Sequence, residues 1–256
     1  MRYRAGSISL SDANDVPLLI SIRNARAITF DHISALACID GFAKNRRVVH
    51  WRLSRLERTG LVRRMTYALL PEQPVFAITR MGLEFLESRG HVLLSLPSST
   101  RDILRSSQIM HSIELAAIRV ALASQGILRS WKWELEIVSA NLVYGEKATK
   151  DYDAIAEIAL ESGVSRFGIE FERTLKGAAR YEELRRVFGT ERSVDTVLYL
   201  TPNSEILYVL AMELRDVRKR IGFALSKTFQ TDLLDADVLS NTSAGELVSL
   251  REFLVS

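Results

Sequence analysis

The chain has 256 residues, of which 47% are hydrophobic, so it is long enough to form two hydrophobic cores. Its net charge of +3 is unevenly distributed, because residues 1–90 carry +6 and the remainder carries −3. This asymmetry predicts a nucleic-acid partner for the N-terminal part. The single cysteine, Cys38, excludes an internal disulfide. Because no apolar run is long enough to cross a bilayer, we expect a soluble, cytoplasmic protein with no membrane partner.

Two short helices are predicted first, over residues 16–23 and 32–38. Thr29 and Asp31 are suitable capping residues for the second helix, since their side-chain oxygens can accept hydrogen bonds from unpaired backbone amides. An Asp-Gly turn at residues 40–41 then leads to a third helix, which is strongly basic.

The basic helix begins near Asn45 and ends before Gly60. Val49, Leu53 and Leu56 repeat at the spacing of a single helix stripe and are expected to face the domain core. The opposite face suits the acceptor-rich major groove of duplex DNA, although the alternative for any isolated basic helix is a solvated charged surface. The residues expected to contact DNA from this helix and the strand after it are Arg46, Arg47, His50, Trp51, Ser54, Arg55, Arg58, Arg63 and Arg64.

A hairpin and a fourth helix follow. Strands are predicted over residues 61–66 and 75–78, separated by a loop that contains two prolines, and Thr79 is expected to cap a helix over residues 80–88. This order of elements, with the segments Leu-Glu-Arg-Thr-Gly-Leu-Val and Ile-Thr-Arg-Met-Gly-Leu-Glu-Phe-Leu, resembles a winged helix-turn-helix. The resemblance implies binding of double-stranded DNA, and the alternative is a winged helix used only for protein contacts.

The second half of the chain is predicted to be α/β. A helix over residues 100–123 precedes a strand in which Trp131, Trp133, Leu135 and Ile137 alternate with charged residues. The other predicted elements are strands over 153–160, 167–172, 194–201 and 221–228, and helices over 175–188 and 204–218. Together they predict a central mixed sheet flanked by helices.

The domain boundary is expected in the segment 94–100, where serine and proline interrupt the apolar pattern. The predicted domains are therefore residues 1–92 and 93–256. The apolar C-terminal segment 247–255 is a candidate contact for a homodimer.

Three carboxylates in the second half suggest metal chemistry. Glu170 and Glu172 share one face of a predicted strand, and Asp153 on the preceding strand could meet Glu170 across the sheet. Two such carboxylates could hold Mg²⁺ or Mn²⁺, and a metal-bound water could attack a phosphodiester. DNA binding alone requires no cofactor, and neither zinc-ligand spacing nor a glycine-rich phosphate loop occurs in the sequence.

These residues resemble the PD-(D/E)XK nuclease superfamily: a helix with Glu114, an aspartate before Ala-Ile-Ala, and Glu-Phe-Glu leading to a helix. More narrowly, His111 ahead of Ile-Arg-Val-Ala-Leu, then Asp-Ala-Ile-Ala-Glu-Ile and Gly-Ile-Glu-Phe-Glu-Arg-Thr, is similar to the replication-relaxation family of plasmids and integrative elements. That family joins an N-terminal winged helix to a nuclease-like domain and is related to the mobilisation C class of relaxases. The resemblance covers about residues 15–200. The candidate catalytic residues are Asp153, Glu170, Glu172, Lys176, Glu114 and His111, with Asp153 and Glu170 as the metal ligands.

Two departures from the superfamily bear on catalysis. Tyr152 stands where the superfamily usually has proline, and Glu172 stands where it has a lysine that orients the attacking water and stabilises the phosphate. A cation could instead come from Lys150, Lys176 or Arg180. The alternative is a nuclease-like fold that has lost its catalytic role. For His111 and Glu114, the alternative is an ordinary surface or half-buried pair.

Three functions follow from these patterns. The first is a DNA-binding protein of a mobile element that acts in plasmid replication, mobilisation or transcriptional control, with relaxosome or replication proteins as possible partners. The second is a metal-dependent DNA nickase or relaxase, and the third is a transcription regulator with a sensing C-terminal domain. Trp51 would contact the DNA backbone or a partner subunit, whereas Trp131 and Trp133 would be core or subunit contacts rather than platforms for nucleobases.

Overall fold

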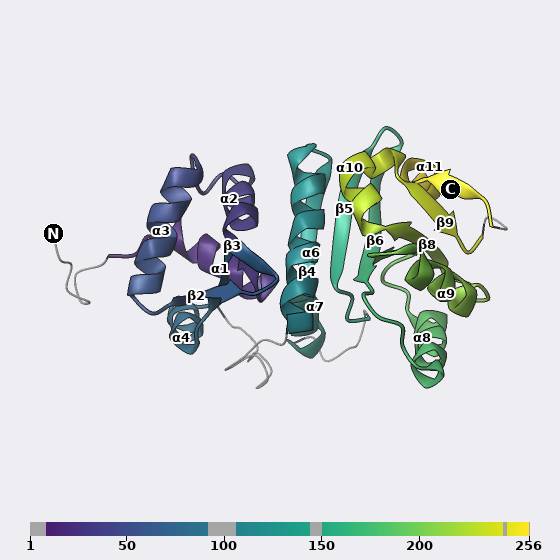
Figure 1. Cartoon of the computed structure of the whole chain (residues 1–256), viewed down its shortest axis with the longest axis horizontal. Coiled ribbons are helices and arrows are strands. Elements are labelled where there is room, and N and C mark those ends of the chain that lie inside the picture. The colour runs from purple at the N-terminus through teal and green to yellow at the C-terminus, as the bar shows by residue number, and fades with distance from the viewer. Residues whose placement is uncertain (1–8, 92–105, 144–149, 243–244, 256) are drawn as a thin grey trace. The chain divides into compact units, whose positions relative to one another are not determined.

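The structure, a computed structural model, describes residues 9–91, 106–143, 150–242 and 245–255 (Figure 1). The chain divides into two compact units, Met1–Val120 and Ala121–Ser256. The predicted junction between residues 92 and 93 and the start of the helix predicted from residue 100 lie outside the described residues. The division falls within helix α6 (Ser106–Ser124), so most of this helix belongs to the first unit.

The first unit combines helices with a small antiparallel sheet. Its other elements are α1 (Asp15–Ala25), β1 (Ile28–Thr29), α2 (Phe30–Ile39), α3 (Arg46–Arg58), β2 (Val62–Tyr67), β3 (Leu70–Ile78) and α4 (Arg80–Ser88). Strand β3 lies between β1 and β2 and is antiparallel to both. The predicted caps Thr29 and Thr79 are confirmed, since their hydroxyls accept hydrogen bonds from the backbone amides of the first turns of α2 and α4. Asp31, the other predicted cap, lies within the first turn of α2 and pairs with Arg46.

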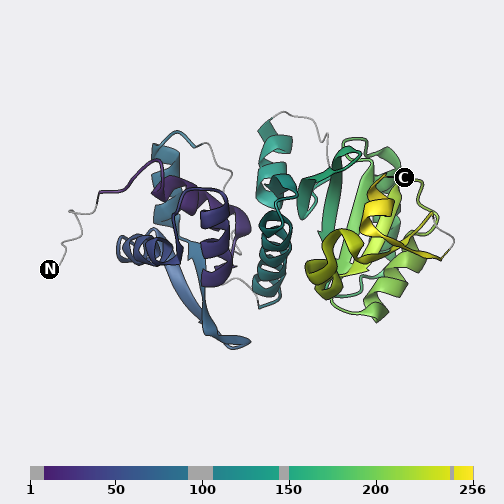
Figure 2. The same ribbon diagram turned by 90° about the horizontal axis from the view of Figure 1, so that it is seen from above.

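The hairpin of β2 and β3 is longer than the sequence predicts. The segment with Pro71 and Pro74, expected as a loop, is part of β3. The register between the two strands shifts between Met65 and Tyr67, and this irregularity accommodates prolines, which cannot donate to the ladder. Figure 2 shows the hairpin, in blue, extending beyond the helices of its unit.

The two faces of this hairpin have different neighbours. Val75 and Ala77 pack in a buried cluster with Ile109 and Ile113 of α6. Phe76, between them in sequence, points to the other face. The predicted helix over residues 100–123 therefore contributes its described N-terminal part to the core of the first unit.

The second unit is built on a mixed sheet flanked by helices, as the sequence predicts. The sheet has seven strands, and the two at residues 237–240 and 247–249 were not predicted. The elements of this unit are β4 (Leu128–Trp133), α7 (Glu134–Val143), β5 (Ala154–Leu160), β6 (Gly163–Phe171), α8 (Ala178–Thr190), β7 (Thr196–Thr201), α9 (Ser204–Leu214), β8 (Arg220–Leu225), α10 (Ser226–Asp232), a 3₁₀ helix (Leu233–Asp235), β9 (Asp237–Ser240), β10 (Leu247–Ser249) and α11 (Leu250–Val255). The strand order is β10-β9-β8-β7-β6-β5-β4. Strands β6, β7 and β8 are parallel, and the other neighbours are antiparallel.

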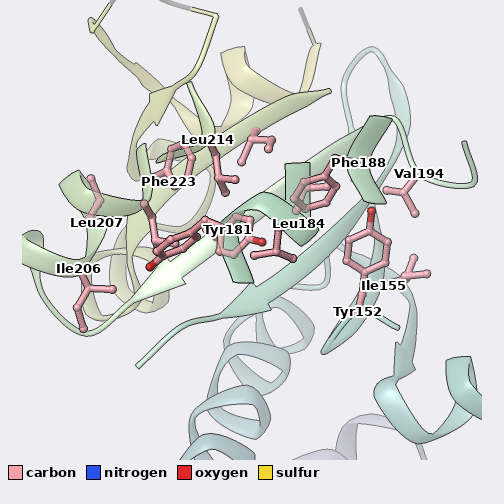
Figure 3. Close-up of a cluster of buried hydrophobic side chains, with 14 of the residues drawn as sticks. Tyr152, Ile155, Tyr181, Leu184, Phe188, Val194, Ile206, Leu207, Leu214 and Phe223 are labelled. Carbon is pink, nitrogen blue, oxygen red and sulfur yellow. The ribbon is translucent and has the colours of Figure 1, made fainter. Parts of the chain in front are cut away.

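Helices cover both faces of this sheet. Leu184 and Phe188 of α8 and Leu214 of α9 gather with Phe223 of β8 in one buried cluster (Figure 3). On the other face, a Cβ added to Gly222 would lie 2.7 Å from Phe253 of α11, so this helix packs directly on the backbone of β8. A sheet buried on both faces explains the nearly continuous apolar sequence of β7.

The strand predicted through Trp131 to Ile137 is wrong beyond Trp133. Leu135 and Ile137 belong to α7, and the carboxylate of Glu136 accepts a hydrogen bond from the backbone amide of Trp133 at 2.9 Å. A glutamate at this position satisfies an amide at the helix start, which favours a helix despite the alternating pattern. Trp133 is buried and its ring meets the half-buried Trp131 edge to face, as expected for core residues.

The C-terminal segment 247–255, a candidate contact for a homodimer, contributes apolar side chains to the core of its own unit. Leu250, Phe253 and Leu254 of α11 are buried within their own unit, and the exposed large hydrophobic residues of the segment are Leu247 and Val255, at its two ends. The strand predicted over residues 221–228 ends at Leu225, and the chain continues as α10. Among the described helices, none is both long and apolar enough to span a membrane.

Candidate nucleic-acid interface and carboxylate cluster

Helix α3 is amphipathic in the predicted orientation. Asn45 caps its start, because its side-chain oxygen accepts a hydrogen bond from the amide of Val48 at 3.1 Å. Val49, Leu53 and Leu56 are all buried, which confirms the predicted core stripe. The chain then turns at Gly60, whose positive φ of 75° is a conformation that glycine adopts without strain.

The face of α3 opposite this stripe is open to solvent. Arg47, His50, Trp51 and Arg58 are exposed, and 55% of the Trp51 surface is accessible. Ser54 is half-buried. These four exposed side chains, all predicted to contact DNA, therefore lie on one accessible face of the helix.

Two of the arginines predicted to contact DNA form contacts with other elements of the first unit. Arg46 forms an ion pair with Asp31 and lies over the ring of Phe30, 4.5 Å from its centroid. Arg55 lies 3.8 Å from the buried carboxylate of Asp15 and also donates to a backbone carbonyl. These contacts attach α3 to α2 and α1, so the sequence-based assignment of both arginines to DNA overlooked a structural role.

The hairpin separates the two arginines that the sequence treats alike. Arg64 is exposed and pairs in register with Phe76, on the face toward α3. Arg63 pairs with Ala77 and shares the face that α6 covers. Because neighbouring residues of a strand point to opposite faces, only Arg64 adjoins the exposed side of α3.

A small hollow of about 100 Å³ lies between α3 and the hairpin. Polar groups from both elements line it, including His50, Ser54, Glu57 and Arg64. The helix and the hairpin thus form one continuous surface that carries both hydrogen-bond donors and acceptors.

The second candidate site consists of the carboxylates on β5 and β6. Ala154 pairs with Ile169 in the antiparallel ladder, so Asp153 and Glu170 are opposite each other on the same face. Glu170 and Glu172 are both buried, with 9% and 7% of their surfaces exposed. The structure therefore brings together the two predicted metal ligands and Glu172.

Each of these carboxylates already has a partner. Lys150 forms an ion pair with Glu170, and Lys176 forms one with Glu172. The carboxylate of Asp153 accepts a hydrogen bond from the backbone amide of Phe171 at 2.7 Å. Arg180, the other cation considered from the sequence, instead pairs with Glu183 on α8.

Burial raises the pKa of Glu170 to about 7. The positive charge of Lys150 acts in the opposite direction, and the nearby carboxylate of Asp153 raises the pKa further. A carboxyl group that titrates near neutral pH beside another carboxylate is typical of a functional site, although buried structural ion pairs produce the same effect.

Tyr152 is a core residue rather than a substitute for proline in a loop. It is fully buried, and its ring lies against Gly168 of β6. Its hydroxyl donates to Glu191 at 3.1 Å, and the ammonium of Lys150 is 4.6 Å from the centre of its ring. The ring of Tyr152 thus packs against the ammonium of Lys150, which is paired with Glu170.

Tyr199 is a member of the cluster that the sequence analysis missed. It pairs in register with Glu170 across β6 and β7, and its buried hydroxyl has no hydrogen-bond partner within the described part of the chain. Burial raises its pKa well above the usual value, and Glu170 and Glu172 add to this effect. Its position in an apolar strand gave no signal, because only the pairing of β7 with β6 brings it to the carboxylates.

His111 and Glu114, the other two candidate catalytic residues, lie on α6. Both are half-buried on the part of α6 that is assigned to the first unit, whereas Asp153, Glu170 and Lys176 are in the second. Over residues 9–91, 106–143, 150–242 and 245–255, no three histidine, cysteine or acidic side chains are grouped as a metal site.

In comparisons with family models, curated proteins and solved structures, no significant match to this chain was found.

Proposed function

We propose that the first unit is a winged helix-turn-helix that binds double-stranded DNA. In this proposal α3 enters the major groove and the hairpin of β2 and β3 is the wing that contacts the phosphate backbone. The observation that carries this proposal is that α3 is amphipathic. Three apolar residues are buried on one face, and Arg47, His50, Trp51 and Arg58 are exposed on the other.

The arrangement of α3 and the hairpin supports this function over a solvated charged helix. A charged helix that serves only for solubility would not require a basic residue on a neighbouring element. Arg64, however, lies on the face of the hairpin that adjoins α3. The excess positive charge of residues 1–90 favours a polyanionic partner rather than a protein surface of mixed charge. Following the resemblance described above, the proposal includes a role in plasmid replication, mobilisation or its transcriptional control.

The test is selection of a duplex by the full chain from a random pool, followed by measurement of its affinity at several salt concentrations. Sequence-specific binding that Arg47→Ala weakens more on the selected duplex than on a random duplex supports the proposal. Equal loss on both duplexes would contradict the assignment of α3 as the reading helix.

A metal-dependent DNA nickase is the second candidate. Asp153 and Glu170 oppose each other on one face of the sheet, and two carboxylates together with water suffice to hold Mg²⁺ or Mn²⁺. The ion would activate water and neutralise charge that develops on the phosphate. Lys150 is paired with Glu170, and a metal ion would compete with its ammonium for the same carboxylate. The site therefore fits a metal ion only if Lys150 moves away from Glu170 when the ion binds.

The cations of the cluster bear on the missing catalytic lysine. Lys176 is paired with Glu172, which places an ammonium beside the position where the superfamily has its lysine. Nicking of supercoiled DNA in the presence of Mn²⁺, lost in both Asp153→Ala and Glu170→Ala but retained in Glu161→Ala, would support this function. Persistence of nicking in either cluster variant would exclude the cluster as its source.

A further inference from the structure

A pocket with no assigned role lies at the other end of the parallel strands. It has a volume of about 730 Å³, which lies within the range of small-molecule sites. It is formed by the end of α8, the segment before β7 and the segment between α9 and β8, and it reaches Thr196 and Arg220 at the starts of β7 and β8. The carboxylate cluster is at the end of β6, so the two sites lie at opposite ends of the sheet.

The pocket is rich in cations that lack a carboxylate partner. The basic residues that line it are Arg185, Arg192, Arg218, Lys219 and Arg220. Lys219 is paired with Glu191 at 2.7 Å, and Arg185 is paired with Glu213. Within the described residues, Arg192, Arg218 and Arg220 form no ion pair. Arg192 donates to the backbone carbonyls of Glu191 and Gly189, each at 2.9 Å, so no carboxylate neutralises these three positive charges.

Arg220 is held in place by neutral groups. Its guanidinium donates two hydrogen bonds to the hydroxyl of Thr196, at 3.0 and 3.2 Å, and lies 5.3 Å from the ring centre of Phe253. Burial lowers its pKa from the usual value, while Asp195 acts in the opposite direction. A positioned and partly desolvated guanidinium binds a phosphate oxyanion more strongly than a freely moving surface arginine does.

Acidic residues in the same lining restrict the kind of anion. Asp195 and Asp216 are exposed members of the pocket. They would repel the continuous charge of a nucleic-acid backbone, but they can accept hydrogen bonds from hydroxyl or amino groups. A compact ligand with one phosphate and several donor groups meets both requirements.

We propose that this pocket binds a small phosphate monoester of about nucleotide size. The phosphate is held by Arg192, Arg218 and Arg220, and the sugar-like part of the ligand contacts the carboxylates of Asp195 and Asp216. This site is independent of DNA binding by the first unit, so either function can fail without the other.

The experiment is calorimetric titration of the full chain with AMP, with adenosine and with inorganic phosphate. AMP is expected to bind about tenfold or more tightly than adenosine, because only AMP has the phosphate. Arg218→Gln, which alters an exposed side chain and leaves the fold intact, should weaken AMP binding about tenfold, and Arg192→Gln should do the same. Arg186→Gln is the matched control, since it removes the same charge from the exposed surface of α8 outside the pocket.

Several results would overturn the proposal. These are no AMP binding at millimolar concentration, equal affinity for AMP and adenosine, or the same loss in Arg186→Gln as in Arg218→Gln. Binding of a duplex oligonucleotide that Arg218→Gln weakens while AMP fails to compete would identify a DNA surface in place of a small-ligand site. Inorganic phosphate that binds as tightly as AMP would place recognition in the phosphate alone and overturn the role of the two aspartates.

Discussion

The guanidinium of Arg55 lies over the ring of Trp51, 4.4 Å from its centroid and one turn away on α3. The same arginine contacts Asp15 of α1, whose side chain is buried. Arg55 therefore both attaches the helix to its core and fixes the orientation of an exposed indole. Arg47, on the same helix, is exposed and has no ion pair among the described residues, so the two arginines are expected to have separable roles.

Replacement of Arg47 and of Arg55 by alanine should have different effects. Arg55→Ala removes the cation beside a buried carboxylate and should lower the free energy of unfolding by about 1–3 kcal/mol. Arg47→Ala should leave stability within about 0.5 kcal/mol of wild type and weaken binding to the selected duplex by about 1–3 kcal/mol. Urea unfolding and fluorescence anisotropy measure the two quantities. Loss of stability in Arg47→Ala would show that this side chain supports the fold.

The two arginines of the hairpin should differ in the salt dependence of DNA binding. Arg64→Gln is expected to reduce the slope of log affinity against log salt by about 0.9, which corresponds to one phosphate contact. Arg63→Gln, on the face covered by α6, should leave the slope unchanged. Affinity measured over a series of salt concentrations tests both variants. A reduced slope in Arg63→Gln alone would reverse the assignment of the hairpin faces.

Glu170 should make a pH-dependent contribution to stability. Burial raises its pKa in the folded chain from 4.5 to about 7, so between these values the folded protein keeps a proton that the unfolded chain has lost. Its contribution to the free energy of unfolding therefore decreases as the pH rises through this window and is constant above it. Glu170→Gln cannot ionise and should gain stability relative to wild type between about pH 5 and about pH 8.

Urea unfolding at the two pH values measures this difference, with Glu161→Gln, in the exposed turn between β5 and β6, as the control. The control should stay at a constant offset from wild type. A constant offset for Glu170→Gln as well would mean that Lys150 keeps Glu170 ionised throughout the range.

The contact between Tyr152 and Gly168 predicts a strong effect of one methyl group. A Cβ at position 168 would lie 2.8 Å from two carbon atoms of the Tyr152 ring, which is too close for either residue without movement. Gly168→Ala should therefore lower the free energy of unfolding by about 1–3 kcal/mol. Gly189→Ala is the control, since a Cβ there has open space and should stabilise α8 by up to about 1 kcal/mol. Chemical denaturation measures the free energy of unfolding of both variants. If this free energy is unchanged in Gly168→Ala, the Tyr152 ring shifts readily to make room for the methyl group.

Much of the first unit follows from residues that are close in sequence. Asn45, Thr29 and Thr79 cap their helices through contacts three residues away, and the buried stripe of α3 repeats within single turns. Such features depend on local backbone geometry, so periodicity and capping chemistry predicted them. The failure at residues 134–137 was also local, because the hydrogen bond between Glu136 and Trp133 outweighs a pattern that alternates by chance.

The tertiary structure decided which of the candidate residues act together. The sequence by itself determined an exposed basic helix and a strand with two carboxylates on one face. It did not determine that Arg63 would face α6, that Lys150 would pair with Glu170, or that Tyr199 would lie beside that carboxylate. These relationships depend on the pairing and packing of segments 20 to 50 residues apart. Pairing at such distances is set by the packing of whole faces, on which local patterns carry no information.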